Sequence, residues 1–113
     1  MNFPFVTQVA FMGLEITGYA QKNLNKVWVD SNDYVEELKK AVTLLDKSQI
    51  FTSIYNIPLC LIPKDIWKYS CKSISNWKQS FLPQCNECTQ KNNCCGLFST
   101  SRYYSNEIKT LTE

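Results

Sequence analysis

The chain has 113 residues, which is enough for one domain and too short for two ordinary ones. Hydrophobic residues make up 44% and aromatic residues 13%, so a modest core is available and the composition argues against wholesale disorder. The net charge of +2 is too balanced to indicate binding to nucleic acid or to an acidic membrane. The chain has no histidine, which excludes histidine-based catalysis and histidine metal ligands.

The first predicted element is a strand over residues 5–16, which are mostly apolar and rich in valine and phenylalanine. Gly18 then predicts a turn or a close approach of the backbone to a neighbouring segment. A helix is expected over about Ser31–Lys47, because Val35, Leu38, Val42 and Leu45 recur at helical spacing on one face. Either Asp30 or Asp33 can cap it, and Asp33 with Glu36 has the spacing of a capping box.

Residues 49–56 are β-branched and aromatic and predict a second strand. Strand, helix and strand at this spacing predict a β-α-β unit with parallel pairing, hence an α/β fold. One such unit leaves a sheet edge and half of a core uncovered. We therefore expect residues 1–58 to be a slice of a larger sheet or barrel.

A helix is also expected between Pro63 and Pro83, where Trp67, Cys71, Ile74 and Phe81 form an apolar stripe. Its lysines favour a solvated amphipathic helix over a nucleic-acid surface. The polar tail, residues 99–113, is expected to be poorly ordered.

Six cysteines could form three disulfides in a secreted protein or bind metal in a reduced compartment. The first residues carry no positive charge, and Gln8 and Glu15 interrupt the apolar stretch that a signal peptide or membrane span would need. We therefore expect a cytoplasmic protein with reduced thiols and no membrane partner. The cysteines also concentrate in residues 85–95, as metal ligands do.

The cysteine spacing predicts a metal site of four thiolates: Cys60, Cys85, Cys88 and Cys94. Cys85 and Cys88 form a C-x-x-C turn, and Cys60 follows the second strand, where parallel sheets place functional groups. Four thiolates suit a structural zinc ion or an iron–sulfur cluster. A redox dithiol is the weaker alternative, because this C-x-x-C follows a predicted helix in a polar loop. Cys71 is expected to be an inert core residue, and Cys95 could replace Cys94 as a ligand.

Several short motifs occur together in one order. They are Ser53-Ile54-Tyr55-Asn56-Ile57-Pro58-Leu59-Cys60, Lys72-Ser73-Ile74-Ser75-Asn76-Trp77-Lys78, and Leu82-Pro83-x-Cys85-x-x-Cys88 followed by Cys94. In this order they resemble the C-terminal end of the HxsC family, the radical SAM maturases of the His-Xaa-Ser system. Thr7-Gln8, Met12-Gly13-Leu14-Glu15 and Trp28-Val29-Asp30 are similar to the last part of that family's partial barrel. The resemblance covers about residues 5–100.

The resemblance implies a partial β-α-β slice of a radical SAM barrel in residues 1–58, followed by a helical, cysteine-rich cluster segment in residues 59–98. It implies that Cys60, Cys85, Cys88 and Cys94 hold an auxiliary [4Fe–4S] cluster in a region similar to a SPASM or twitch segment. The family modifies ribosomally made precursor peptides with the help of S-adenosylmethionine. Cys95 departs from the family, which has Cys-Gly-Gly where this chain has Cys-Cys-Gly.

A second departure is that the C-x3-C-x2-C motif for the S-adenosylmethionine cluster is absent from the sequence. We therefore expect no S-adenosylmethionine cleavage by this chain alone. The expectation is a C-terminal fragment, or a chain that docks on an N-terminal radical SAM half or partner maturase. The alternative function is a structural four-cysteine zinc (Zn²⁺) module for docking on another protein. No nucleic-acid partner is expected.

Overall fold

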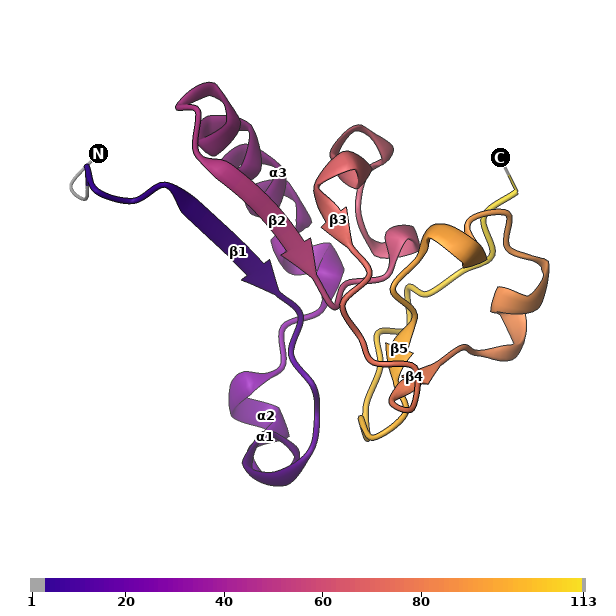
Figure 1. Cartoon of the computed structure of the whole chain (residues 1–113). Coiled ribbons are helices and arrows are strands. Elements are labelled where there is room, and N and C mark those ends of the chain that lie inside the picture. The colour runs from indigo at the N-terminus through magenta and orange to yellow at the C-terminus, as the bar shows by residue number, and fades with distance from the viewer. Residues whose placement is uncertain (1–3, 113) are drawn as a thin grey trace.

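The structure is a computed structural model, and it describes residues 4–112. Its helices and strands follow one another along the chain as shown in Figure 1. They are β1 (Gln8–Met12), α1 (Gly18–Lys22), α2 (Leu24–Val27), α3 (Ser31–Lys47), β2 (Phe51–Tyr55), the 3-10 turns η1 (Leu59–Leu61) and η2 (Lys64–Tyr69), β3 (Ser70–Cys71), β4 (Gln79–Ser80), the 3-10 turns η3 (Pro83–Glu87) and η4 (Lys91–Asn93), and β5 (Leu97–Phe98). The architecture is a small mixed α/β domain.

The main sheet has three strands in the order β1-β2-β3. The strands β1 and β2 are parallel, with Gln8 opposite Phe51 and Met12 opposite Tyr55. This register confirms the predicted parallel strand–helix–strand unit, although β1 is shorter than the expected strand over residues 5–16. The third strand, β3, pairs in parallel with the end of β2.

Helix α3 has the predicted bounds, and its apolar face packs on the sheet through Leu38 and Val42. Asp30 occupies the N-cap position. At the other end Gln49 adopts a left-handed conformation with φ of 61°. The N–H of Ile50 donates to the carbonyl of Leu45 at 3.0 Å, and the N–H of Gln49 donates to the carbonyl of Asp46 at 3.0 Å. This pair of hydrogen bonds is a Schellman motif with glutamine where glycine is usual.

The prediction of a helix between Pro63 and Pro83 is wrong. The segment forms the 3-10 turn η2, then β3, and later β4. Serine and asparagine are frequent in residues 70–76, and both compete with helical hydrogen bonding through their side chains. The indole N–H of Trp67 also donates to the carbonyls of Leu59 and Ile62 at 3.0 and 3.1 Å, which holds η2 against η1. Tertiary contacts therefore outweighed the helical preference that the apolar stripe indicates.

The tail after Ser99 is packed, in contrast to the expected poor order. The hydroxyl of Ser101 accepts a 2.9 Å hydrogen bond from the N–H of Ile16, and the N–H of Arg102 donates to the carbonyl of Ile16 at 2.7 Å. Ile108 is buried. The tail thus returns to the loop that follows β1 and then runs beside the cysteine-rich turns (Figure 1).

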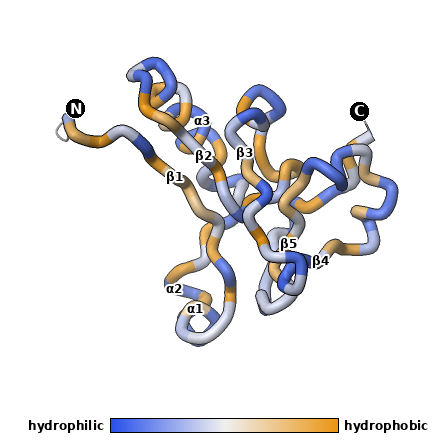
Figure 2. The backbone as a smooth tube through the Cα atoms, in the orientation of Figure 1, coloured by the Kyte–Doolittle hydropathy of each residue, from blue (hydrophilic) through white to orange (hydrophobic). Residues whose placement is uncertain are grey.

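One apolar core joins α3, the sheet and the first 3-10 turns. It is formed by Leu38, Val42, Ile54, Ile57, Leu59, Ile62 and Ile66, all of which are buried. Figure 2 shows apolar stretches along β1 and β2, while polar and apolar residues alternate over short distances in the cysteine-rich turns. Within residues 4–112 no helix combines the length and the apolar character that a membrane span requires.

Candidate metal centre

Four cysteines line one small cavity between the end of the sheet and the C-terminal turns. They are Cys60, Cys85, Cys88 and Cys94, the four that the sequence singles out. The cavity, which we call the cysteine cavity, has a volume of about 20 Å³. Its other walls are mainly apolar and include Leu59, Phe81, Leu97 and Leu111. Segments far apart in sequence therefore bring four thiols to one small, weakly polar space.

Short 3-10 turns position these cysteines. Cys60 lies in η1, just beyond the carboxyl end of β2. Cys85 lies within η3 and Cys88 at its C-cap, where the N–H of Cys88 donates to the carbonyl of Cys85 at 3.1 Å. Cys94 is the C-cap of η4. The C-x-x-C turn therefore has the tight geometry expected of a pair of ligands to one centre.

Cys94 is the most strongly polarised of these thiols. Its Sγ accepts hydrogen bonds from the backbone N–H groups of Leu59 and Gly96, both at 3.4 Å. A hydrogen bond from the Cys95 thiol, those two N–H groups and the charge of Lys72 lower the pKa of Cys94 to about 6, although burial acts in the opposite direction. A thiolate with such donors is the form in which cysteine binds metals.

The Cys60 thiol differs, because its pKa is raised. Burial is the main cause, and the neighbouring thiols of Cys94, Cys85 and Cys88 add to it. A hydrogen bond with the backbone of Lys109 acts in the opposite direction. The other three thiols therefore lie near enough to Cys60 to disfavour its thiolate. A bound cation would relieve the cost of placing thiolates there.

The two remaining cysteines lie outside the cavity wall. Cys95 is buried, and its thiol donates to the carbonyl of Gly96 at 3.3 Å. The hydrogen bond with Cys94 and burial raise the pKa of Cys95. Cys71 lies on β3 and is half-buried, so the expectation of a core residue on a helix is wrong. The structure thus presents Cys94 to the cavity, while the neighbouring Cys95 is buried outside the cavity wall.

The tail lines part of the cysteine cavity. The sequence pattern did not predict this role of the tail. Ile108, Lys109 and Leu111 line the cavity. The hydroxyl of Thr110 donates to the carbonyl of Gln84 at 2.6 Å, and the carbonyl of Leu111 accepts from the N–H of Thr89 at 2.9 Å. The only sequence sign of this role was the presence of Ile108 and Leu111 in an otherwise polar segment.

The donor set fits a soft metal centre, because it consists of thiols with backbone N–H donors, and none of the described residues that line the cavity carries a carboxylate. Among residues 4–112, however, no group of three or more Cys, Asp or Glu side chains has a metal-holding arrangement. The four thiols therefore surround a common space without forming a coordination shell. Comparison of the chain with protein-family models, curated proteins and solved structures gives no match.

Proposed function

We propose that this chain binds a metal centre through Cys60, Cys85, Cys88 and Cys94, and that the centre is the auxiliary [4Fe–4S] cluster of a radical SAM peptide maturase similar to the HxsC family. The observation that carries the proposal is the common cavity lined by these four cysteines. The resemblance of the sequence motifs to that family supplies the choice of an iron–sulfur cluster. The N–H groups that donate to Cys94 add support, because such hydrogen bonds stabilise a ligating thiolate.

Within this proposal, the bound cluster would supply single-electron transfer or a binding point for the precursor peptide. The chain's own residues would hold the site together. The tail residues around Leu111 would cover part of the site, and Lys72 would provide positive charge near Cys94. The peptide-modifying activity would require a partner that supplies the S-adenosylmethionine cluster, because the sequence has no C-x3-C-x2-C motif.

The test is anaerobic purification and reconstitution of the full chain, followed by iron, sulfide and zinc analysis and absorbance spectroscopy. We expect about four irons and four sulfides per chain and a broad band near ~400 nm. A chain that binds neither iron nor zinc would overturn the proposed metal centre.

Cysteine variants give the matched controls. Serine substitution at each of the four cavity cysteines is expected to abolish or greatly weaken metal binding. Cys71→Ser is the control, because Cys71 lies on β3 away from the cysteine cavity. Cys95→Ser is a second control that should retain metal, since the Cys95 side chain is not on the cavity wall. Loss of metal in the Cys71→Ser variant, with binding kept in Cys85→Ser, would contradict the ligand assignment.

A structural zinc ion is the second candidate, and the size of the cysteine cavity favours it. A volume of about 20 Å³ accommodates a group the size of one water molecule, which suits a single ion better than a four-iron cluster. In this case the chain would be a docking module for another protein. One zinc per chain and a colourless protein after anaerobic purification would select this function over the first.

The proposed dependence on a partner has its own assay. Reconstituted alone with dithionite and S-adenosylmethionine, the chain is expected to form no 5′-deoxyadenosine above a control without protein. A radical SAM partner protein or N-terminal half added in trans, together with a precursor peptide, should restore its formation. Turnover by the chain alone would overturn this part of the proposal.

A further inference from the structure

A second and larger cavity lies at the carboxyl ends of β1 and β2, between the N-terminus of α3 and the tail. Its volume is about 330 Å³, within the ~300–1,000 Å³ typical of small-molecule sites. Six aromatic side chains contribute to its wall: Phe11, Trp28, Tyr34, Phe98, Tyr103 and Tyr104. We call this space the aromatic cavity. The crevice beyond the carboxyl ends of parallel strands is where open α/β sheets commonly bind ligands.

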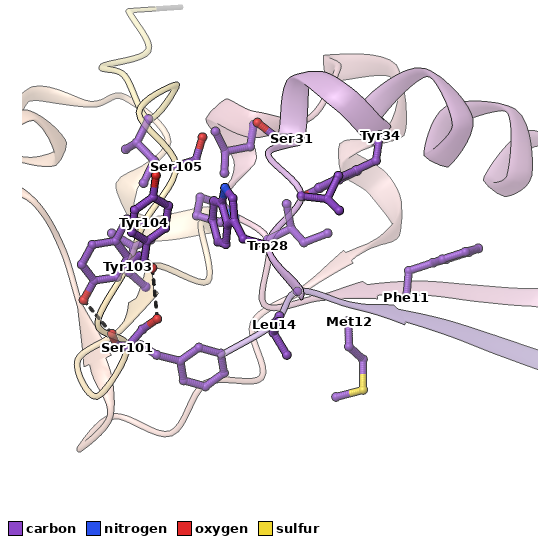
Figure 3. A pocket seen from close by; sticks show the side chains of 18 of the residues that line it. Phe11, Met12, Leu14, Trp28, Ser31, Tyr34, Ser101, Tyr103, Tyr104 and Ser105 are labelled. Carbon is purple, nitrogen blue, oxygen red and sulfur yellow. Dashed lines mark hydrogen bonds between the residues drawn. The ribbon is translucent and has the colours of Figure 1, made fainter. Parts of the chain in front are cut away.

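Contacts within the wall hold its aromatic rings in place. Trp28 and Tyr103 meet edge to face, with ring centroids 4.6 Å apart (Figure 3). The hydroxyl of Tyr104 donates to the carbonyl of Phe98 at 2.8 Å, so its polar end is satisfied by the protein. These rings therefore offer a preformed apolar surface, which lowers the entropic cost of binding a flat ligand.

The mouth of the aromatic cavity exposes large apolar side chains to solvent. Met12 is 69% exposed, Leu14 53% and Val29 54%, and all three line the cavity. Figure 3 shows Met12 and Leu14 on the side of the mouth opposite Ser105. Exposed apolar residues that gather around a cavity mark a surface that a ligand covers.

The charge around the cavity restricts the class of ligand. None of the described residues that line it is lysine, arginine, aspartate or glutamate. Behind two lining residues lies the carboxylate of Asp30, which accepts hydrogen bonds from the hydroxyls of Ser105 at 2.7 Å and Ser31 at 3.2 Å. Asp30 is itself only part-buried and does not line the cavity, so its charge acts through the two serines of the wall.

We propose that the aromatic cavity binds a small aromatic ligand that bears an amine, accepts an uncharged one more weakly, and excludes one with a carboxylate. The aromatic faces attract a cation, and the negative charge of Asp30, held next to the lining residues Ser31 and Ser105, adds to this preference. An anion would meet the same charge without a basic partner. The proposal does not depend on the metal centre, because the cysteine cavity is a separate space that shares only a few wall residues with this one.

Three indoles with side chains of similar size and different charge provide the test: tryptamine, indole-3-acetamide and indole-3-acetate. Their dissociation constants for the full chain are measured by ligand-observed NMR or calorimetry at pH 7. We expect tryptamine to bind about fivefold more tightly than the acetamide, and the acetate to bind most weakly. Equal affinities, tightest binding of the acetate, or no binding of any of the three would overturn the proposal.

Variants of the chain then test whether the indoles bind in the aromatic cavity. Asp30→Asn should remove most of the preference for tryptamine and leave indole-3-acetamide binding unchanged; asparagine also caps helices well, so α3 should persist. Leu14→Trp should obstruct the mouth and weaken all three indoles at least about tenfold. It alters an exposed rim residue and should not compromise folding. Trp77→Ala is the control, because Trp77 is 76% exposed and lies outside the cavity. An effect of Trp77→Ala equal to that of Leu14→Trp would place the indoles elsewhere.

Discussion

The sheet region (residues 4–71) and the cysteine-rich region (residues 72–112) are stabilised in different ways. In the sheet region a 17-residue helix packs a regular apolar face on parallel strands. The cysteine-rich region has only two-residue strands and short 3-10 turns, and side-chain and backbone contacts with the tail connect them. Periodic burial thus builds the first region, whereas the second depends on individual polar contacts and, in our proposal, on a metal.

The cysteine cavity lies where the two regions meet. Cys60 belongs to the sheet region, and Cys85, Cys88 and Cys94 belong to the cysteine-rich region. The sheet region thus supplies one cysteine from a regular, well-packed element, and the cysteine-rich region supplies the other three from its turns. A ligand held by both would tie the turns to the core.

Metal removal should affect the cysteine-rich region most. If the proposed centre is present, chelation should lower the free energy of unfolding by several kcal/mol, and by on the order of 10 kcal/mol for a structural zinc ion. Limited proteolysis should then cut within residues 72–112 while the helical circular dichroism of α3 persists. Simultaneous loss of the α3 signal would show that the two regions do not differ in this way.

Ile54→Ala should destabilise the sheet region most among single core changes. Ile54 is 0% exposed and lies in β2 against α3, so its truncation leaves a cavity and should cost about 2–5 kcal/mol in urea unfolding. Leu44→Ala is the matched control on α3, where the side chain is 65% exposed. Comparable losses in both variants would contradict the position of the core.

Ser101→Ala should remove one of the polar contacts that fix the tail. The Ser101 hydroxyl accepts from the buried N–H of Ile16, which would be left without that partner, at a cost of about 1–3 kcal/mol. Urea unfolding measures this loss. Arg102→Ala is the control, because that side chain is exposed. A neutral Ser101→Ala variant would mean that the tail is held mainly by Ile108 and its apolar neighbours.

Gln49→Gly should stabilise the sheet region. Gln49 ends α3 with φ of 61°, a left-handed conformation that glycine adopts without steric cost. Because glycine also loses more entropy on folding, we expect a net gain of only about 0.5–1 kcal/mol. Gln21→Gly within α1 provides a contrast, since glycine inside a helix should destabilise.

The smallest expected effect is on acid stability. The hydrogen bond from Ser105 is the main cause that lowers the pKa of Asp30 below its ordinary value of 3.8. Charged Asp30 therefore stabilises the fold above about pH 4, and this contribution is lost as the pH falls through the lower folded-state pKa. In thermal melts between about pH 2 and 6, the melting temperature of the Asp30→Asn variant should fall slightly less steeply with decreasing pH than that of the unaltered chain. An unchanged dependence of the melting temperature on pH would mean that other carboxylates dominate the loss of stability in acid.

The sequence by itself determined the parts of the fold that repeat. The apolar spacing of α3 gave its bounds, and the flanking β-branched runs gave the parallel pairing of β1 with β2. The sequence also identified the four cysteines that line one cavity, because a C-x-x-C pair and a cysteine beyond a parallel strand carry positional meaning. These features have local or periodic physical causes, so the residues near each position in the sequence are enough to predict them.

The tertiary structure alone decided the remaining features. The stripe from Trp67 to Phe81 did not become a helix, because η2 hydrogen-bonds to η1 and β3 completes the sheet. The tail covers the cysteine cavity through Thr110 and Leu111, whose partners lie more than 20 residues earlier. The aromatic cavity likewise joins Trp28 to Tyr103 across most of the chain. Such contacts depend on which surfaces the folded chain brings together, and no local pattern encodes that.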